Sequence, residues 1–324
     1  MAGKPKILIT RRWPERVEAR LAEDYRLTVN RADRPLDRAA LAAALRDFDA
    51  VLPTVTDPMP AEIFDQPRLR ARILANYGVG HSHIDIAAAR ARGIVVTNTP
   101  DVLSECTADL AMTLLLMAAR RAGEGERELR AGRWAGWRPT HMIGTRVSGK
   151  TLGIIGFGRI GQAMAARARH GFGMRILVHN RSPVPAAILA RHDAAEVARL
   201  EDLLPECDFV SLHCPGGGAN RHLIDAGRLG LMKPSAFLVN TARGEVVHER
   251  ALAQALQSGA IAGAGLDVYE DEPRVAAELL AAPNAVLLPH LGSATRETRE
   301  AMGWRVAENL AAFFAGRPPR DRVA

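Results

Sequence analysis

Short apolar runs alternate with stretches of helical periodicity along the first hundred residues of the chain. The apolar runs cover residues 6–10, 50–53, 71–76 and 94–98 and have the length of buried strands. Between them, stretches such as "LDRAALAAALRDF" and "IDIAAARARG" carry apolar residues at the spacing of one helix face. Regular alternation of strand and helix predicts a parallel sheet with right-handed crossovers.

A second series of apolar runs begins at residue 151 and again has helical segments between most of its members. Its runs are "TLGIIG", "MRILVHN", "DFVSLHC", "AFLVNTA", "AGAGLDV" and "AVLLPH". Two such series predict an α/β protein with two doubly wound parallel-sheet domains. The apolar segment 102–119 predicts one long helix that joins them, and a last amphipathic helix carries Met302, Val306, Leu310 and Phe313 at helical spacing.

The composition is that of an ordinary globular protein of 324 residues, 48% hydrophobic and 24% charged. The net charge of +7 comes from basic residues spread among acidic ones, with only 5% aromatic residues, so we predict no nucleic-acid partner. The longest apolar run, 110–119, is too short to span a membrane. The amino terminus lacks the pattern of a signal peptide, and the three cysteines form no CxxC motif. We therefore expect a cytoplasmic protein with no metal site.

The strongest local motif is Gly156-x-Gly158-x-x-Gly161, which follows an apolar strand and precedes a helical segment. The first glycine of such a motif allows a tight turn, the second lets the backbone approach a pyrophosphate, and the third lets helix pack on strand. A helix amino terminus also favours bound anions. The motif predicts a dinucleotide site. The stretch "NYGVGHSH" has His83 where a third glycine would stand, so it is not a second such site.

Three chemically complementary residues follow later strands of the same series: Arg243, Glu272 and His290. Each alone has an ordinary structural explanation, but open α/β sheets bind their ligands at the carboxyl ends of the strands. An arginine can hold a carboxylate with two hydrogen bonds, and a histidine can protonate an oxygen that becomes negative as hydride arrives. A neighbouring glutamate favours the imidazolium form. Together they suit hydride transfer to a 2-oxo acid.

The chain resembles the D-isomer-specific 2-hydroxyacid dehydrogenases over essentially its whole length. The resemblance is carried by the glycine motif and by the stretches "NYGVGHSHIDI", "LVNTARGEVV", "GAGLDVYEDEP" and "LLPHLGSAT". The resemblance implies a Rossmann cofactor domain, residues 101–289, inserted into a flavodoxin-like substrate domain, residues 1–100 plus 290–324. It implies that Arg243, Glu272 and His290 are catalytic, and that Val79 and Gly80 bind the substrate carboxylate through their amides, together with Arg243. The residues that it implies around the cofactor are Thr107, Gly156, Gly158, Arg159, Ile160, Gly161, Pro215, Thr241, Ala242, Asp267 and Gly292.

Within the family, "NTPDVLSECTADLAM" and "GRWAGWRPTHMIG" are most similar to the glyoxylate/hydroxypyruvate reductase branch. That branch implies NAD(P)H-dependent reduction of a small 2-oxo acid by a homodimer, with Trp137 reaching the partner's substrate pocket. Trp137 as an ordinary interface anchor is the alternative. Two other functions stay open: a dehydrogenase for a larger 2-hydroxy acid, and a dinucleotide-sensing, corepressor-like binding protein. Side chains near Leu52 to Val55 are expected to set the size of the substrate pocket.

The tip of the strand "MRILVHN" carries Asn180, Arg181 and Ser182 and has no acidic residue. NAD sites place an Asp or Glu about 20 residues past the glycines to bind the ribose 2′-hydroxyl, whereas NADP sites place an arginine near the 2′-phosphate. The tip therefore predicts that NADP(H) is the preferred cofactor. NAD(H), with Asn180 on the 2′-hydroxyl, is the alternative.

Overall fold

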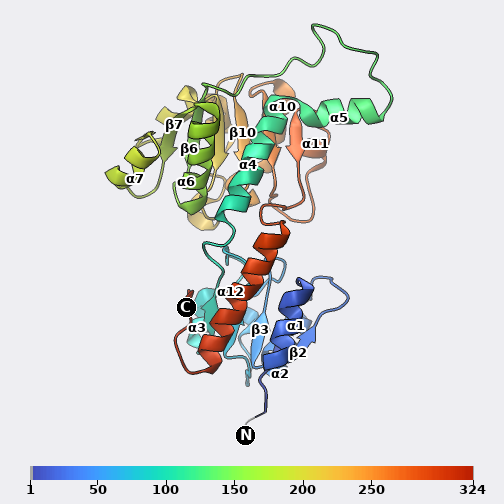
Figure 1. The fold of residues 1–324 in the computed structure, drawn as a ribbon, viewed down its shortest axis with the longest axis vertical. Coiled ribbons are helices and arrows are strands. Elements are labelled where there is room, and N and C mark those ends of the chain that lie inside the picture. The colour runs from blue at the N-terminus through green and yellow to red at the C-terminus, as the bar shows by residue number, and fades with distance from the viewer. Residues whose placement is uncertain (1–2, 324) are drawn as a thin grey trace. The chain divides into compact units, whose positions relative to one another are not determined.

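The computed structural model describes residues 3–323 and divides into two compact units (Figure 1). Unit 1 comprises Met1–Leu103 and Ala294–Ala324, and unit 2 comprises Ser104–Ser293. The sequence-based boundaries at 100/101 and 289/290 fall a few residues before these junctions. The outermost positions of the first predicted domain, residues 1, 2 and 324, lie outside the described part of the chain.

Unit 1 is built on a five-stranded parallel sheet with strand order β2-β1-β3-β4-β5. Its strands are β1 (Lys6–Ile9), β2 (Arg26–Val29), β3 (Ala50–Leu52), β4 (Ile73–Ala75) and β5 (Val95–Thr97). Its helices are α1 (Glu15–Asp24), α2 (Arg38–Asp47), the single turn η1 (Ala61–Ile63), α3 (Ile86–Ala91) and α12 (Arg296–Phe314). This flavodoxin-like order confirms the predicted fold class of this part of the chain.

Helices cover both faces of the unit 1 sheet, which explains why its central strands read as continuous apolar runs. On one face Leu8, Val51 and Leu74 share a core with residues of α2, η1 and α3. On the opposite face α1 packs against α12, and a Cβ added to Gly303 of α12 would lie only 2.6 Å from a methyl group of Val17. Glycine at that position lets the two helices approach closely.

Unit 2 is built on a seven-stranded parallel sheet with strand order β12-β11-β10-β9-β6-β7-β8. Its strands are β6 (Thr151–Ile155), β7 (Arg175–His179), β8 (Ala194–Glu196), β9 (Phe209–Leu212), β10 (Phe237–Asn240), β11 (Gly263–Leu266) and β12 (Ala285–Leu287). Counted from β6, this is the order of a Rossmann sheet, with its switch point between β6 and β9. The predicted doubly wound architecture is confirmed here too.

Two hydrophobic cores lie on the two faces of the unit 2 sheet. One contains residues of α4 (Ser104–Ala119), α6 (Arg159–Ala166) and the π-helical turn η2 (Arg167–Gly171), with α7 (Ala186–Arg191) packed at its edge. The other contains residues of α8 (Leu200–Leu203), η3 (Leu204–Glu206), α9 (Ala226–Leu231), η5 (Gly244–Val246), α10 (Glu249–Ser258) and α11 (Ala277–Leu280). The remaining elements are α5 (Ala122–Arg130) and the turn η4 (Gly218–Asn220).

The apolar pattern predicts ten of the strands and misses two. These are β2, at one edge of the unit 1 sheet, and β8, at one edge of the unit 2 sheet. The strand β2 alternates exposed and half-buried residues, and no residue of the three-residue β8 is fully buried. Their side chains therefore form no apolar run, whereas β5 and β12, at the opposite edges, each keep buried residues and were predicted. The predicted helix over 102–119 is α4, which begins at Ser104. Among residues 3–323, no helix is long and apolar enough to cross a membrane.

Candidate active site

The glycine loop between β6 and α6 is shaped by two different demands. Gly156 has φ +91°, and a Cβ there would lie 2.6 Å from the backbone nitrogen of Cys214, while a Cβ on Gly161 would collide with the carbonyl oxygen of Gly156. At Gly158 nothing lies within 4 Å of an added Cβ. The protein's own packing therefore requires the first and third glycines, whereas the second borders open space.

The helix α6 begins directly at this open position, with Gly158 as its N-cap and no side chain capping its first N–H groups. Free N–H groups and the helix dipole make such a terminus receptive to an anion. The open space at Gly158 is where a close backbone approach to a pyrophosphate would need it. These residues fit a bound dinucleotide.

Asn180, the first residue after β7, ties the strand tip to the glycine loop. Its Oδ1 accepts a hydrogen bond from the Phe157 N–H (3.1 Å), and its Nδ2 donates to the Ser182 carbonyl oxygen (2.7 Å). Arg181 and Ser182 are exposed on the turn that results. The amide of Asn180 is thus engaged within the protein, and the side chains left at the tip are a cation and a hydroxyl.

Arg243 follows a turn that is closed by Asn240, the last residue of β10. The buried Asn240 side chain accepts from the Ala242 N–H (3.0 Å) and donates to the Arg243 carbonyl oxygen (2.9 Å). The Arg243 guanidinium donates to the Ala242 carbonyl oxygen (2.7 Å). Burial lowers the pKa of Arg243, while the charges of Glu272 and Glu245 act in the opposite direction. A guanidinium is not deprotonated inside proteins, so Arg243 remains a cation.

Asp267, the first residue after β11, fixes the loop that carries His290. Its two carboxylate oxygens accept from the N–H groups of Leu291 (2.6 Å) and Gly292 (2.8 Å), and its carbonyl oxygen accepts from the His290 N–H (3.0 Å). The Thr107 hydroxyl donates to the Gly292 carbonyl oxygen from α4 (3.1 Å). These contacts hold His290 at φ +57°, a left-handed conformation that costs a non-glycine residue free energy.

His290 and Glu272 form a hydrogen-bonded pair, with Nδ1 of the imidazole 2.8 Å from Oε2 of the carboxylate. The other carboxylate oxygen of Glu272 accepts from the Tyr269 N–H (3.1 Å). Each of the paired side chains is about one-third exposed (31% and 32%), so the ring remains reachable from solvent. Because Nδ1 faces the carboxylate, Nε2 is the nitrogen left for a substrate.

The charges around this pair keep Glu272 ionised. Burial acts to raise its pKa, but the hydrogen bond and charge of His290, the Tyr269 N–H and the charge of Arg243 together lower the pKa below its ordinary value. Burial likewise raises the pKa of the Asp267 carboxyl, against the lowering effect of its two backbone donors. The three predicted catalytic residues thus occupy one electrostatic neighbourhood, with an anion between two cation-forming groups.

Most other predicted cofactor residues of unit 2 surround these loops. Thr107, Thr241 and Asp267 are buried, whereas Arg159 is exposed at the start of α6 beside the half-buried Ile160. Pro215 is the third residue of the loop after β9, where its carbonyl oxygen accepts from the Asn220 side chain (2.8 Å). Within residues 3–323, no group of three or more His, Cys, Asp or Glu side chains is placed to hold a metal ion.

Val79 and Gly80 lie in unit 1, on the half-buried loop that follows β4. Their backbone N–H groups donate to no acceptor within the described chain. Unpaired N–H groups on a partly buried loop are suited to an anion such as a carboxylate.

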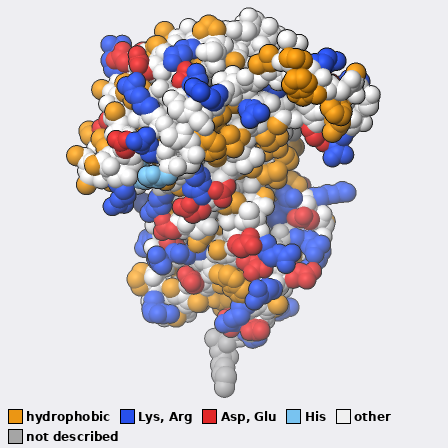
Figure 2. Space-filling model, turned by 45° about the horizontal axis from the view of Figure 1, so that its top comes forward, with side chains coloured by type: hydrophobic (Ala, Val, Ile, Leu, Met, Phe, Trp, Pro, Cys, Tyr) orange, Lys and Arg blue, Asp and Glu red, His pale blue; other side chains and the backbone are white. Residues whose placement is uncertain are grey.

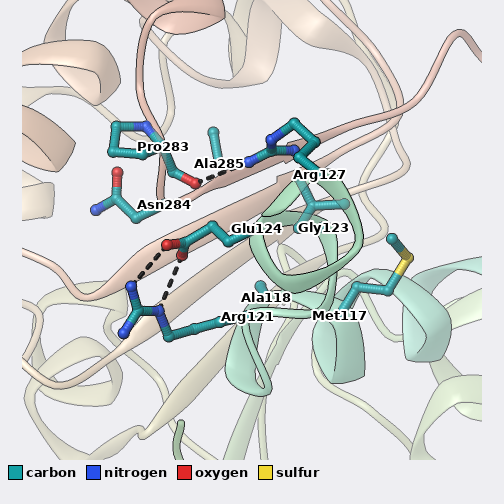
Figure 3. A pocket seen from close by; sticks show the side chains of 10 residues that line it. Met117, Ala118, Arg121, Gly123, Glu124, Arg127, Pro283, Asn284 and Ala285 are labelled. Carbon is teal, nitrogen blue, oxygen red and sulfur yellow. Dashed lines mark hydrogen bonds and ion pairs between the residues drawn. The ribbon is translucent and has the colours of Figure 1, made fainter. Parts of the chain in front are cut away.

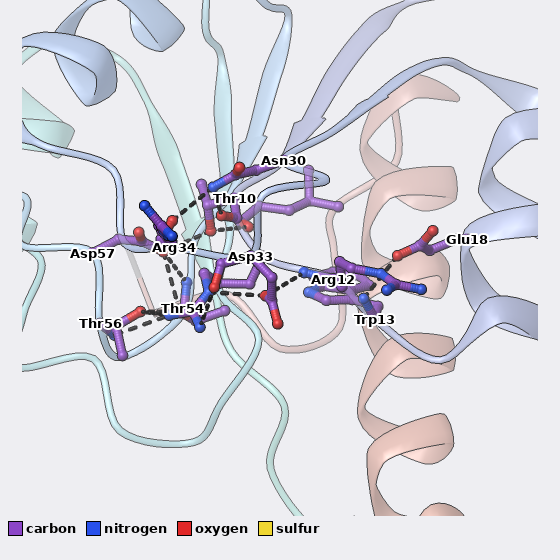
Figure 4. Close-up of polar contacts among 12 residues, drawn as sticks. Thr10, Arg12, Trp13, Glu18, Asn30, Asp33, Arg34, Thr54, Thr56 and Asp57 are labelled. Carbon is purple, nitrogen blue, oxygen red and sulfur yellow. Dashed lines mark hydrogen bonds and ion pairs between the residues drawn. The ribbon is translucent and has the colours of Figure 1, made fainter.

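A second polar cluster lies where β1 and β3 of unit 1 end (Figure 4). One oxygen of the buried Asp57 accepts from the Thr10 hydroxyl (2.6 Å) and the Thr54 N–H (2.7 Å), which fixes the turn after β3. The segment expected to set the size of the substrate pocket runs through this turn, and its two ends differ in burial. Leu52 is fully buried inside the unit 1 core, whereas Val55 is 39% exposed.

The segment that follows α4 carries four of the seven exposed large hydrophobic side chains of unit 2. It comprises α5 and residues 131–147, and the exposed side chains are Leu129, Trp134, Trp137 and Ile143. Trp137 is 82% exposed. Hydrophobic side chains gather in the upper right of Figure 2, where Figure 1 places α5. We call this segment the arm.

The base of the arm is held against the start of β12 (Figure 3). Arg121 donates two hydrogen bonds to the Glu124 carboxylate (3.1 and 2.6 Å), and Arg127 donates to the Pro283 carbonyl oxygen (3.4 Å). The small pocket between them is also lined by Met117 and Asn284. None of the predicted site residues lines this pocket, so it belongs to the support of the arm.

Comparison with known proteins decides the family. The model described as "D-isomer specific 2-hydroxyacid dehydrogenase, NAD binding domain" matches residues 112–292. Over 99% of its length, the chain is 49% identical to a glyoxylate reductase of Thermococcus kodakarensis, of which it covers 96%. The chain belongs to the D-isomer-specific 2-hydroxyacid dehydrogenase family. The resemblance inferred from its motifs is therefore confirmed, and so is the presence of an NAD(P)-binding domain.

Solved structures of this dehydrogenase family agree with the fold. An NADPH-dependent glyoxylate/hydroxypyruvate reductase of Sinorhizobium meliloti, in complex with NADP and malonate, is 38% identical with a TM-score of 0.87, over 99% of this chain and 97% of that one. A putative D-isomer specific 2-hydroxyacid dehydrogenase from Polaromonas is 36% identical with a TM-score of 0.92, over 99% and 100% of the two chains.

Sequence reasoning did not single out the residues that position the dehydrogenase side chains. Asn240 and Tyr269 orient Arg243 and Glu272 through backbone contacts. The available signal was their position: Asn240 ends a strand, and Tyr269 lies three residues after the end of a strand, each three residues before a candidate catalytic residue.

The first prediction concerns the glycine loop. Replacing Gly158 with Ala should leave the free energy of unfolding within about 0.5 kcal/mol of the parent value, because the new methyl group meets open space. It should weaken NADH and NADPH binding at least about tenfold, since the methyl group occupies the space that a pyrophosphate needs. Urea unfolding and nucleotide fluorescence titration measure the two effects.

Gly156→Ala is the matched control, because it is strained at φ +91° and should lose about 1–3 kcal/mol of stability. Unchanged nucleotide affinity in Gly158→Ala would mean that the open space does not receive the cofactor.

Proposed function

We propose that this protein reduces a small 2-oxo acid, such as glyoxylate or hydroxypyruvate, to the D-2-hydroxy acid with NAD(P)H. The observation that carries the proposal is the 2.8 Å His290–Glu272 pair beside the cationic Arg243, in the unit that also holds the glycine loop. The printed names of the relatives, glyoxylate reductases of archaea, support the same substrate class.

In this proposal, His290 is the proton donor of the reduction. A reduced nicotinamide supplies the hydride to the carbonyl carbon. The carbonyl oxygen then gains negative charge, and Nε2 of His290 gives it a proton, since Nδ1 is held by Glu272. The ionised Glu272 stabilises the imidazolium form and orients the ring. Arg243 binds the substrate carboxylate, and so do the amides of Val79 and Gly80.

The cofactor's pyrophosphate takes the open amino terminus of α6, at Gly158, Arg159 and Ile160. Its remaining contacts come from the other predicted residues, Thr107, Pro215, Thr241, Ala242, Asp267 and Gly292. We further propose a cytoplasmic location, in keeping with three free cysteine thiols.

We propose that NADPH is preferred over NADH. The tip of β7 has no acid to repel a 2′-phosphate, and the Asn180 amide is already bonded to Phe157 and Ser182. Arg181 and Ser182 are exposed there and can donate charge-assisted and neutral hydrogen bonds to a phosphate.

We also propose a homodimer in which the arm meets a second copy. Four large hydrophobic side chains exposed on one segment favour burial in an interface. Trp137, the most exposed of them, is the residue we assign to the partner's substrate pocket.

The proposed proton donor makes the second prediction. His290→Ala should lower kcat for glyoxylate reduction by about 10²–10⁴-fold, the usual contribution of a positioned acid. NADPH affinity should stay within about twofold, and the exposed His170→Ala should behave as wild type. The assay follows nicotinamide absorbance.

A His290→Ala variant with wild-type kcat would remove His290 from the mechanism. A wild-type protein that binds NADPH tightly but reduces neither glyoxylate nor larger 2-oxo acids would instead point to a dinucleotide sensor.

Cofactor choice makes the third prediction. A hydrogen bond to a charged group contributes roughly 1.5–3 kcal/mol, so Arg181→Ala should weaken NADPH by about 10- to 100-fold and leave NADH nearly unchanged. Arg199→Ala, another exposed arginine of unit 2 (70%), is the control. The measurement is kcat/KM with each cofactor. Equal losses for both cofactors, or a wild-type preference for NADH, would refute the phosphate contact.

The fourth prediction concerns the arm. Light scattering should report a dimer for the wild type, and Trp137→Ala should raise KM for glyoxylate while the dimer persists. The control is Leu231→Ala, at an exposed hydrophobic residue outside the arm (40%), which should change neither. Dissociation of the dimer by Trp137→Ala, with monomers of unchanged KM, would make Trp137 an interface anchor and not a pocket residue.

A further inference from the structure

We infer that Asn76 and Asn98 are positioning residues for the substrate: their side-chain amides turn the loop Gly78–His81 so that its backbone N–H groups face a carboxylate. This inference rests on the proposed function, because it assumes that the Val79 and Gly80 amides bind the 2-oxo acid. It adds two residues that touch the loop and not the substrate.

Asn76 is the first residue after β4 and is completely buried. Its Nδ2 donates to two carbonyl oxygens of the loop, those of Gly78 (2.9 Å) and Gly80 (3.0 Å). Carbonyl oxygens only accept hydrogen bonds, so the amide nitrogen must face them, and both of its hydrogens are used. The Oδ1 of the same amide is buried without a donor in the described chain. The side chain therefore acts through its two donated hydrogen bonds.

Asn98 holds the carbonyl between those two. It is the first residue after β5, which pairs with β4 so that Ala75 and Thr97 lie side by side. From there its Nδ2 donates to the Val79 carbonyl oxygen (2.9 Å). The Asn98 backbone is itself held by the end of the chain, since its N–H donates to the Asp321 carbonyl oxygen (3.2 Å).

Holding three successive carbonyls determines where the following N–H groups point. In a planar trans peptide the N–H of one residue points opposite to the C=O of the residue before it. The carbonyls of Gly78, Val79 and Gly80 are bound to the two asparagines, and that of Gly78 also accepts from the Thr99 N–H (3.1 Å), so the next N–H groups are directed away from them. The N–H groups of Val79, Gly80 and His81 accordingly donate to no acceptor within residues 3–323.

As a result, the loop presents only the partial positive charge of its N–H groups to a ligand. Successive N–H groups without neighbouring free carbonyls form an anion-binding concavity, whereas an unheld loop can rotate a carbonyl oxygen toward the ligand. A carbonyl oxygen there would repel a carboxylate. Asn76 and Asn98 thus exclude the orientation that opposes substrate binding, and their effect belongs to substrate affinity rather than to proton transfer.

The test compares Asn76→Asp and Asn98→Ala with wild type. Asn76→Asp sets a carboxylate against two carbonyl oxygens. Asn98→Ala removes, from a half-buried position, the 2.9 Å donor to the Val79 carbonyl oxygen and leaves it only Nδ1 of His81 at 3.4 Å. The matched control is Asn284→Asp in unit 2, where an asparagine amide also donates to two carbonyls, those of Leu256 (3.3 Å) and Ala262 (3.1 Å). Measured are KM and kcat for glyoxylate, the Kd of oxamate for the NADPH-loaded protein by calorimetry, the Kd of NADPH, and Tm.

We expect both variants to raise KM for glyoxylate and Kd for oxamate by about 10- to 100-fold, as for lost hydrogen bonds to a charged group. Their kcat should fall less than about threefold, and NADPH affinity should not change. Asn284→Asp should lose Tm without a change in KM. This split between KM and kcat is what a merely structural role would not produce.

Folded variants with KM and oxamate affinity equal to those of Asn284→Asp would overturn the inference while leaving the proposed function intact. If Asn76→Asp does not fold, Asn98→Ala alone decides in the same way. A wild-type protein that neither reduces glyoxylate nor binds oxamate would overturn the proposed function and the inference with it.

Discussion

Short amide and carboxylate side chains at the carboxyl ends of parallel strands hydrogen-bond to the backbone of loops at the same end of their sheet, and most of the candidate site loops depend on this interaction. Asn76 and Asn98 do so after β4 and β5, Asn180 after β7, Asn240 at the end of β10, and Asp267 after β11. A strand end leaves backbone donors and acceptors without ladder partners, and buried ones must be satisfied. These side chains are short enough to reach them, and each thereby gives its loop one shape.

The loop of His290 shows the energetic side of this arrangement. A left-handed histidine costs of order 1–3 kcal/mol, and the charge-assisted bonds from Leu291 and Gly292 to Asp267 offset it. Burial raises the pKa of the same carboxyl, and the two backbone N–H groups act against that shift by stabilising its ionised form. Strain at the proposed proton donor is thus balanced by a residue that touches the loop backbone and not the imidazole.

What the sequence predicts well is what local pattern determines. The central strands can be predicted from their apolar runs because helices cover both faces of each sheet. The glycine loop can be predicted because its strand, turn and helix are contiguous in the sequence. Arg243, Glu272 and His290 were found by their places after strands. Asp267 was expected only to line the cofactor, and its contacts with Leu291 and Gly292 join residues more than twenty positions apart. Asn76 was missed because an asparagine after a strand looks like an ordinary turn residue until the two loop carbonyls that its amide binds are located. The prediction missed β2 and β8 because their exposed and half-buried side chains form no apolar run.

The path of the chain has a consequence for synthesis on the ribosome. Unit 1 is left at Leu103 and completed only by Ala294–Ala324, and α12 covers the sheet face that α1 shares. Until α12 has been made, apolar side chains such as Val17, which lies against Gly303 of α12, lack part of the cover that buries them completely in the finished protein. Unit 2 is one continuous segment and can fold as soon as it emerges. The nascent chain therefore carries an incomplete, aggregation-prone amino-terminal part of unit 1 for the time needed to translate about 190 residues. A chaperone would be needed most during that interval.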